Sequence, residues 1–116
     1  MAKPTPIDVS NTKAQMRKGI LEFCILLIVS QEEIYTNDIL QELHKADLIV
    51  VEGTIYPILN RLKDADLLTY NWLESKSGPP RKYYSITPLG RTFLRQLIDT
   101  WQSLDSSINA LMKKFN

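Results

Sequence analysis

Residues that build catalytic and metal sites are scarce in this sequence. Its 116 residues include one cysteine, Cys24, and one histidine, His44. A single cysteine cannot form an intrachain disulfide, and the two residues fit no metal-ligand spacing or catalytic constellation. We therefore predict no metal, no cofactor and no enzymatic activity. Cys24 lies in an apolar stretch, which favours inert core packing over redox sensing, and His44 is expected at the surface of a short helix.

Long apolar runs and a marked net charge are also lacking. The longest apolar stretch, residues 20–29, is interrupted by Glu22 and is too short to span a bilayer. The N-terminus has no apolar core of the kind found in signal peptides, so we expect a soluble cytoplasmic protein with no membrane partner. The net charge is only +1, so any attraction to nucleic acid must come from local patches.

The first half of the chain is predicted to be helical behind a flexible arm. Residues 1–10 contain two prolines and little apolar surface, which is typical of an arm. Residues 11–29 lack proline and become increasingly apolar, which predicts a first helix. After a polar break, Thr36 is a candidate N-cap for a short second helix that ends near Lys45.

A third helix is predicted to begin between Glu52 and Ile55, after a short strand formed by the β-branched run 49–51. A turn of 3.6 residues places four apolar side chains on one buried face: Ile55, Ile58, Leu59 and Leu62. The opposite face then carries Gly53, Pro57 and Asn60, flanked by Thr54, Tyr56 and Arg61. Asp66 is expected to take the left-handed position after this helix.

A β-hairpin is predicted from segments 68–73 and 82–86, which flank a turn at Gly78-Pro79-Pro80. Three positive charges lie near its tip, on Lys76, Arg81 and Lys82. Side chains alternate along a strand, so Tyr83 and Tyr84 must point to opposite faces. We expect Tyr84 to be buried and Tyr83 to be available to a phosphate or a partner.

A long C-terminal helix is predicted to start at Thr87-Pro88, an N-cap followed by a first-position proline. Its apolar residues are spaced alternately by three and four: Leu94, Leu97, Trp101, Leu104, Ile108, Leu111 and Phe115. The rest of so small a chain cannot bury such a seam. A second copy is the simplest partner, so we predict a twofold homodimer.

The order of a helix, a basic hairpin and a second helix is typical of a winged DNA-binding protein. The fold class expected is mainly α with a small β hairpin, a winged helix-turn-helix. We divide the chain into the arm at 1–10, a DNA-binding domain at 11–88 that includes the first helix, and a C-terminal dimerisation helix at 89–116.

The sequence resembles the PadR-type transcriptional regulators over most of its length. Residues 53–62, GTIYPILNRL, are similar to the family's recognition-helix motif, and residues 78–87 with Gly90 are similar to its wing and helix junction. With one C-terminal helix, the chain is similar to the short branch of the family, which includes multidrug-responsive members. The resemblance implies that the long first and last helices of each subunit form the dimer. Thr36 and Asp66 stand where many members have glycine, at a cap and a turn.

Eight residues are candidates for DNA contact: Thr54, Tyr56, Asn60, Arg61, Lys76, Arg81, Lys82 and Tyr83. Asn60 suits adenine edges or phosphate, Arg61 suits guanine or phosphate, and the hairpin cations suit phosphates. Tyr56 could instead pack against the hairpin, and Arg61 could pair with Asp64 or Asp66. In a dimer the two recognition helices would enter successive major grooves about 34 Å apart, which predicts an inverted-repeat operator.

Trp101 and Asp105 are candidates for a ligand site in the seam of the C-terminal helix. Paired indoles could stack on a planar aromatic effector while Asp105 offsets a positive charge. The resemblance agrees, because some short members hold planar, often cationic compounds between such tryptophans. The alternative is that Trp101 fills the dimer core and Asp105 pairs with Lys13, Arg17 or Lys18 of the other subunit.

The leading interpretation of function is a DNA-binding transcriptional regulator. It would act as a homodimeric repressor on double-stranded DNA and be released by a planar aromatic effector. The alternative is a winged-helix protein-interaction or dimerisation module without sequence-specific DNA binding, for which the low net charge is the best argument.

Overall fold

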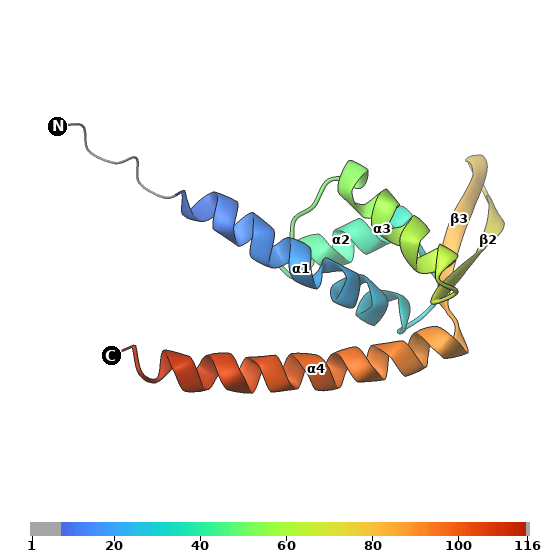
Figure 1. The fold of residues 1–116 in the computed structure, drawn as a ribbon. Coiled ribbons are helices and arrows are strands. Elements are labelled where there is room, and N and C mark those ends of the chain that lie inside the picture. The colour runs from blue at the N-terminus through green and yellow to red at the C-terminus, as the bar shows by residue number, and fades with distance from the viewer. Residues whose placement is uncertain (1–7, 116) are drawn as a thin grey trace.

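A computed structural model describes residues 8–115. It contains four helices and three strands within that range, with the bounds α1 Val9–Val29, β1 Ile34–Tyr35, α2 Thr36–Lys45, α3 Glu52–Asp64, β2 Leu68–Ser75, β3 Gly78–Ile86 and α4 Pro88–Met112 (Figure 1). The strands form an antiparallel sheet in the order β1-β3-β2. The fold is therefore mainly helical with a small sheet, as predicted. None of the described helices is long and apolar enough to cross a membrane.

The core lies where α1, α2 and α3 pack together against the base of the sheet. Its fully buried side chains include Ile25, Leu26, Ile39, Leu43, Ile55, Leu59, Leu62 and Tyr84. All four apolar residues predicted for the inner face of α3 are buried. Burial of this face, at about 25 cal/mol per Å² of apolar area, holds α3 in place and leaves its other face in solvent.

Three local predictions are wrong. Residues 49–51 form no strand, because they lie beside no free strand edge, and β propensity alone does not make a strand. Tyr35, rather than Thr36, is the N-cap of α2, since β1 keeps the backbone extended up to Tyr35 and Thr36 is already helical and buried. The hairpin turns at residues 76–77, and Gly78-Pro79-Pro80 belong to β3, beside a register shift where prolines are tolerated.

The start of α1 differs slightly from the prediction. Residues 1–7 of the predicted arm lie outside the described residues. Asp8 is the N-cap, and its carboxylate accepts a hydrogen bond from the Ser10 backbone N–H at 2.9 Å. Val9 and Ser10 are therefore helical, two residues earlier than expected, because an aspartate cap satisfies an otherwise unpaired N–H of the first turn.

A junction joins the end of α3, the base of the hairpin and the start of α4. Asp66 has φ 63°, the left-handed conformation predicted for it. The Thr87 hydroxyl donates to the Asp66 carbonyl at 2.6 Å and accepts from the Gly90 N–H at 2.9 Å. A Cβ on Gly90 would lie 2.1 Å from the Leu67 carbonyl oxygen, so only glycine allows α4 to start this close to that turn.

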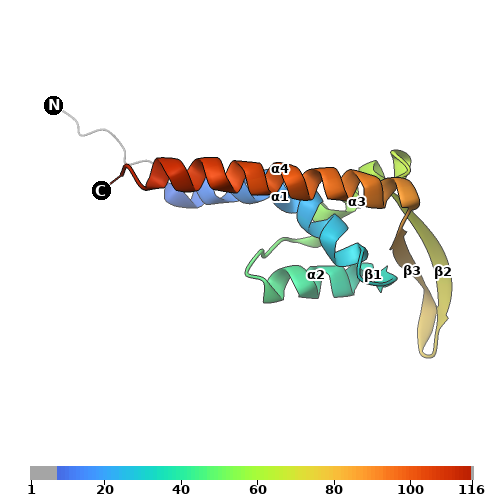
Figure 2. The ribbon, with the colours of Figure 1, turned by 90° about the horizontal axis from the view of Figure 1, so that it is seen from below.

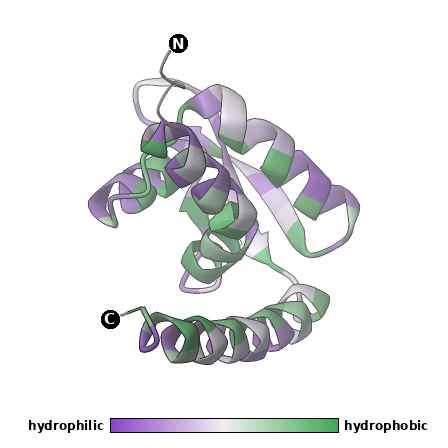
Figure 3. Cartoon of the chain, turned by 60° about the vertical axis from the view of Figure 1, so that its left-hand side comes forward, coloured by the Kyte–Doolittle hydropathy of each residue, from purple (hydrophilic) through white to green (hydrophobic). Residues whose placement is uncertain are grey.

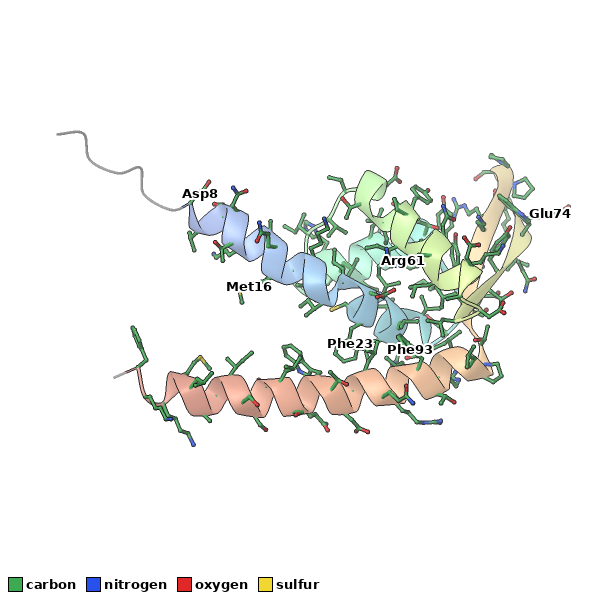
Figure 4. The ribbon with its side chains drawn as sticks, in the orientation of Figure 1. Asp8, Met16, Phe23, Arg61, Glu74 and Phe93 are labelled. Atoms are coloured by element: carbon green, nitrogen blue, oxygen red, sulfur yellow. The ribbon has the colours of Figure 1, made fainter. Side chains whose placement is uncertain are left out.

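α4 runs along α1 and then past it. Figure 1 shows the two helices approaching each other along the first half of α4 and diverging towards the two chain ends, with α3 on the far side of α1, and in Figure 2 the first part of α1 lies behind α4. Phe23 of α1 and Phe93 of α4 face each other where they meet (Figure 4). Hydrophobic residues recur along α4 beyond this region (Figure 3), and Trp101, Leu104, Ile108, Leu111 and Phe115 are exposed within the single chain.

Candidate nucleic-acid interface

The exposed face of α3 has a crest and two flanks. Gly53, Pro57 and Asn60 lie along the crest, opposite the buried face, and all three are exposed. Successive residues turn by about 100° around a helix, so Tyr56 lies on one flank, while Thr54 and Arg61 lie on the other. The structure therefore divides the candidate residues of α3 between a flank beside the hairpin and a flank beside α1.

On the hairpin flank, α3 and the wing formed by β2 and β3 enclose a groove of about 470 Å³. Its lining includes Tyr56 from α3, Trp72 from β2, and Arg81 and Lys82 from β3. One of the four candidate residues of α3, Tyr56, and two of the three candidate wing cations therefore line the same groove. Trp72 was not predicted to belong to the site; it is 62% exposed, and it faces Lys82 across the hairpin in the strand register.

Tyr56 is positioned to act as a hydrogen-bond donor in this groove. Partial burial raises the pKa of its hydroxyl above the ordinary value, the charge of Glu52 raises it further, and Lys82 opposes the rise. The phenol therefore keeps its proton at neutral pH and can donate to an acceptor such as a phosphate oxygen. Tyr56 lines the groove with the wing and is still 43% exposed, so it packs against the wing and remains accessible.

The Lys82 ammonium is held by aromatic rings on the inner face of the wing. It lies 4.0 Å from the ring centroid of Tyr70, with Trp72 and Tyr84 next nearest at 5.8 and 5.6 Å. Lys63 of α3 approaches the same Tyr70 ring at 5.9 Å. Attraction between a cation and a ring quadrupole amounts to about 0.5–1 kcal/mol at exposed sites. The rings therefore fix the positive charge of Lys82 at the groove. Lys63, which the sequence did not single out, lies outside the groove lining and pairs with Asp64 at 3.8 Å.

The outer face of the wing carries Tyr83. Its ring packs on Tyr35 of β1 with centroids 5.8 Å apart, and the Arg81 guanidinium lies 4.9 Å from the centre of the Tyr35 ring. Tyr83 and Tyr84 point to opposite faces and Tyr84 is the buried one, as predicted. Tyr83 is half-buried and lies outside the groove lining. Lys76 is exposed in the turn at the tip.

On the α1 flank, Arg61 pairs with a residue that was not predicted. Its Nε lies 3.3 Å from the Glu22 carboxylate of α1, whereas the alternative considered from the sequence was a pair with Asp64 or Asp66. Both side chains are partly exposed, so this ion pair contributes little stability. Near the start of α3, Thr54 lines a groove of about 410 Å³ together with Arg17 and Lys18 of α1.

A third groove, of about 810 Å³, lies between the diverging ends of α1 and α4. Its apolar lining includes Met16, Ile20, Trp101, Leu104 and Ile108. The Trp101 ring is 6.4 Å from that of Phe23. Asp105 is exposed and is absent from this lining, and Asp47 is the carboxylate that lines the groove within the described chain.

Comparison with known proteins decides what kind of protein carries these grooves. The sequence model of the transcriptional regulator PadR-like family matches residues 25–96. The chain belongs to the PadR-like family. This PadR-like chain is 53% identical to a PadR-like transcription factor from Bacteroides fragilis, with 87% of this chain and 98% of that chain covered and a TM-score of 0.73.

Two further solved structures agree. A PadR-like transcriptional regulator from Bacillus cereus is 40% identical, with 84% of this chain and 96% of that chain covered and a TM-score of 0.77. A PadR family transcriptional regulator from Eggerthella lenta is 29% identical, with 90% and 91% covered and a TM-score of 0.82. Members of the family are transcriptional regulators that bind DNA, so this PadR-like protein is a DNA-binding regulator and not an enzyme.

The family match covers only part of the features described above. It extends from Ile25 in α1 to Gln96 in α4 and includes α3 and the whole wing. Trp101, Asp105 and the exposed end of α4 lie beyond it, as do Arg17 and Lys18. The match therefore includes α3 and the wing of this PadR-like regulator, whereas the grooves along the first half of α1 must be interpreted from their own chemistry.

Proposed function

We propose that the protein is a transcriptional repressor that binds an inverted-repeat operator as a homodimer. The observation that carries this proposal is the groove shared by Tyr56 of α3 and Arg81 and Lys82 of the wing. It brings a polar helix face and fixed positive charges to one surface, the combination with which winged proteins bind a base-pair groove and its phosphates. The cytoplasm is the compartment proposed for this activity.

The apolar side of α4 supports the homodimer. Six large apolar residues from Trp101 to Phe115 are exposed in the single chain, and five of them belong to the seam of alternating spacing. Soluble monomers rarely leave so long an apolar stripe in water, and heptad spacing suits a matching helix. Such a helix would pack beside the diverging ends of α1 and α4 and close the groove of about 810 Å³ that lies between them. In the proposed dimer the two α3 helices enter successive major grooves about 34 Å apart.

The proposed DNA contacts divide into base reading and phosphate binding. Asn60 is exposed on the crest of α3, so its amide is proposed to read a base edge, preferably adenine. Phosphate binding is proposed for the residues on the flanks of α3, which are Thr54, Tyr56 and Arg61. Arg61 must first break its ion pair with Glu22. Contact with the adjacent sugar-phosphate backbone of the DNA is proposed for the wing residues Lys76, Arg81, Lys82 and Tyr83. Tyr83 can reach it only from the outer face of the wing.

We also propose that a planar aromatic effector releases the DNA by binding in the groove beside Trp101. The groove is lined mainly by apolar side chains, which suits stacking against the indole ring. Asp47 lines it together with Lys13 and Arg17, so Asp47 offsets a cationic effector where the effector lies away from these two cations, with Asp105 contributing where the second subunit closes the site. Binding would favour the dimer geometry in which the two α3 helices no longer match the operator spacing.

The test is selection of DNA from a random duplex library, followed by fluorescence anisotropy with the enriched sequence. An enriched inverted repeat, bound by one dimer per site, supports the proposal. Asn60→Ala removes one bidentate base contact from each subunit, so it should weaken binding of the dimer to that repeat about 30-fold or more, while binding to unrelated DNA stays unchanged. A library that yields no symmetric motif would contradict the repressor and favour a protein-interaction module.

The effector needs a separate measurement. Trp101→Ala should weaken the binding of planar cationic dyes. Binding is monitored by quenching of tryptophan fluorescence in the native protein, and by dye fluorescence in the native protein and in the variant. Trp72→Phe removes the other tryptophan and serves as the control that isolates the Trp101 signal. Dye affinity that is unchanged in Trp101→Ala would refute the effector site without touching the DNA-binding proposal.

A further inference from the structure

The groove beside the start of α3 is lined by residues that carry positive charge. Arg17 and Lys18 of α1 form one side, and Thr54 lies on the other. The remaining lining is apolar and comes from Ala14, Leu21, Ile49, Val50 and Val51. None of these lining residues is acidic, and within residues 8–115 neither cation has a carboxylate at ion-pair distance. The groove therefore holds uncompensated positive charge next to the DNA-reading helix.

The start of α3 adds to this local field. Its N-cap is Val51, whose side chain cannot accept a hydrogen bond from the first-turn N–H groups. A Cβ built on Gly53 meets no atom within 4 Å, so the backbone there is open to close approach from outside the protein. The N–H groups of an uncapped helix start carry a partial positive charge of the same sign as Arg17 and Lys18, which the Glu52 carboxylate in the first turn partly offsets.

We infer that this groove is a phosphate-binding site that extends the DNA surface past the start of α3, with Arg17 and Lys18 on the sugar-phosphate backbone. The occupant is the backbone of the same duplex that α3 reads, because the groove shares Thr54 with α3 and continues its exposed face. Apolar Ile49 and Val51, both exposed, suit contact with deoxyribose rings. The wing and this groove then flank α3, one on each side.

This assignment rests on the proposed function and deepens it. Without it, the DNA surface would be α3 and the wing alone, and α1 would contribute only to packing and to the dimer. With it, two of the three basic residues of α1 have a defined partner. The contact is to phosphate, so it should raise affinity for every sequence equally and leave the choice of operator to α3.

The experiment compares the salt dependence of DNA binding in the full-length protein and in Arg17→Gln/Lys18→Gln. Anisotropy titrations against the selected duplex and an unrelated one give the slope of log affinity against log salt. Each lost phosphate contact should make the slope less negative by about 0.9, and the double variant loses two contacts in each subunit of the dimer, so its slope should differ by about 3.6, equally on both duplexes. A slope and affinity equal to those of the native protein would overturn the inference.

Two controls separate charge from packing. Arg95→Gln removes one exposed cation from α4, on the other side of α1 from α3 (Figure 1), and should leave the slope unchanged. Arg17→Lys/Lys18→Arg keeps both charges and should keep the native slope; if it loses binding as the Gln variant does, the residues act by packing and the inference fails. A native protein that binds neither duplex would instead defeat the proposed function itself, so the two failures are distinguishable.

Discussion

Gly90 is the position at which a single methyl group should damage this fold most. In Gly90→Ala the added Cβ would lie 2.1 Å from the Leu67 carbonyl oxygen and 2.7 Å from Cγ1 of Ile86. Carbon and oxygen atoms not bonded to each other stay more than 3 Å apart, so α4 must move by about 1 Å. That movement strains the hydrogen bonds that the Thr87 hydroxyl makes with the Asp66 carbonyl and the Gly90 N–H.

The expected cost follows from these two effects. Overpacking of a tight site costs about 1–3 kcal/mol. Loss of an N-cap hydrogen bond adds about 1 kcal/mol. Gly90→Ala should therefore lower the free energy of unfolding by about 2–4 kcal/mol, a large part of the roughly 5–15 kcal/mol that stabilises a typical domain.

The assay is urea unfolding followed by circular dichroism, at one fixed protein concentration because association would shift the midpoint. Gly19→Ala is the matched control: the same methyl group enters the exposed surface of α1, where it meets no atom within 4 Å. It should raise the free energy of unfolding by about 0.5–1 kcal/mol, since alanine is the better helix former. Equal effects of the two substitutions would refute the reasoning from close contact.

Three further predictions concern single residues. Asp66→Gly removes the cost of a left-handed backbone at φ 63° and should raise the free energy of unfolding by about 0.5–1 kcal/mol, whereas a loss would show that the aspartate side chain is needed. Burial raises the pKa of the Cys24 thiol above its ordinary value of 9.0, so the native protein should react with iodoacetamide at pH 8 more slowly than the urea-unfolded chain; equal rates would contradict this. The pKa of the Cys24 thiol is higher in the folded protein than in the unfolded chain, so the stability that this group contributes is complete below pH 9.0 and is lost as the pH rises through the folded pKa. The free energy of unfolding measured against pH should show this loss. Tyr70→Leu removes the ring beneath Lys82 and should weaken DNA binding by up to about fivefold without changing operator choice, and an altered choice in a repeated selection would count against a positioning role.

The sequence predicted α3 well because its evidence is periodic. Four apolar residues at helical spacing can be buried only on one face, so the positions of Asn60 and Tyr56 on the exposed side followed directly. The left-handed Asp66 was predictable for a similar reason, since a helix that runs straight into a strand needs such a residue at its end. These are local rules that tertiary packing did not override.

The features that were missed depend on three-dimensional neighbours. β1 has only two residues and exists because Tyr83 and Tyr84 of β3 offer them partners, while residues 49–51 have stronger β propensity and no partner. Gly78-Pro79-Pro80 has the composition of a turn, yet the chain already reverses at residues 76–77. Neither the Arg61–Glu22 pair nor the groove of Arg17, Lys18 and Thr54 could be read from spacing, because each joins residues more than thirty positions apart.

The junction at Thr87 has a mechanical consequence. One hydroxyl bridges the turn after α3 and the first turn of α4, and the hairpin leaves from the same place. The end of α3, the base of the wing and the start of α4 are thus held together as one rigid unit. A 25-residue helix is about 37 Å long, so a tilt of about 5° at one end moves the other by about 3 Å. In the proposed dimer, a small change of tilt at the C-terminal end of α4 would therefore displace α3 and the wing of the same subunit together.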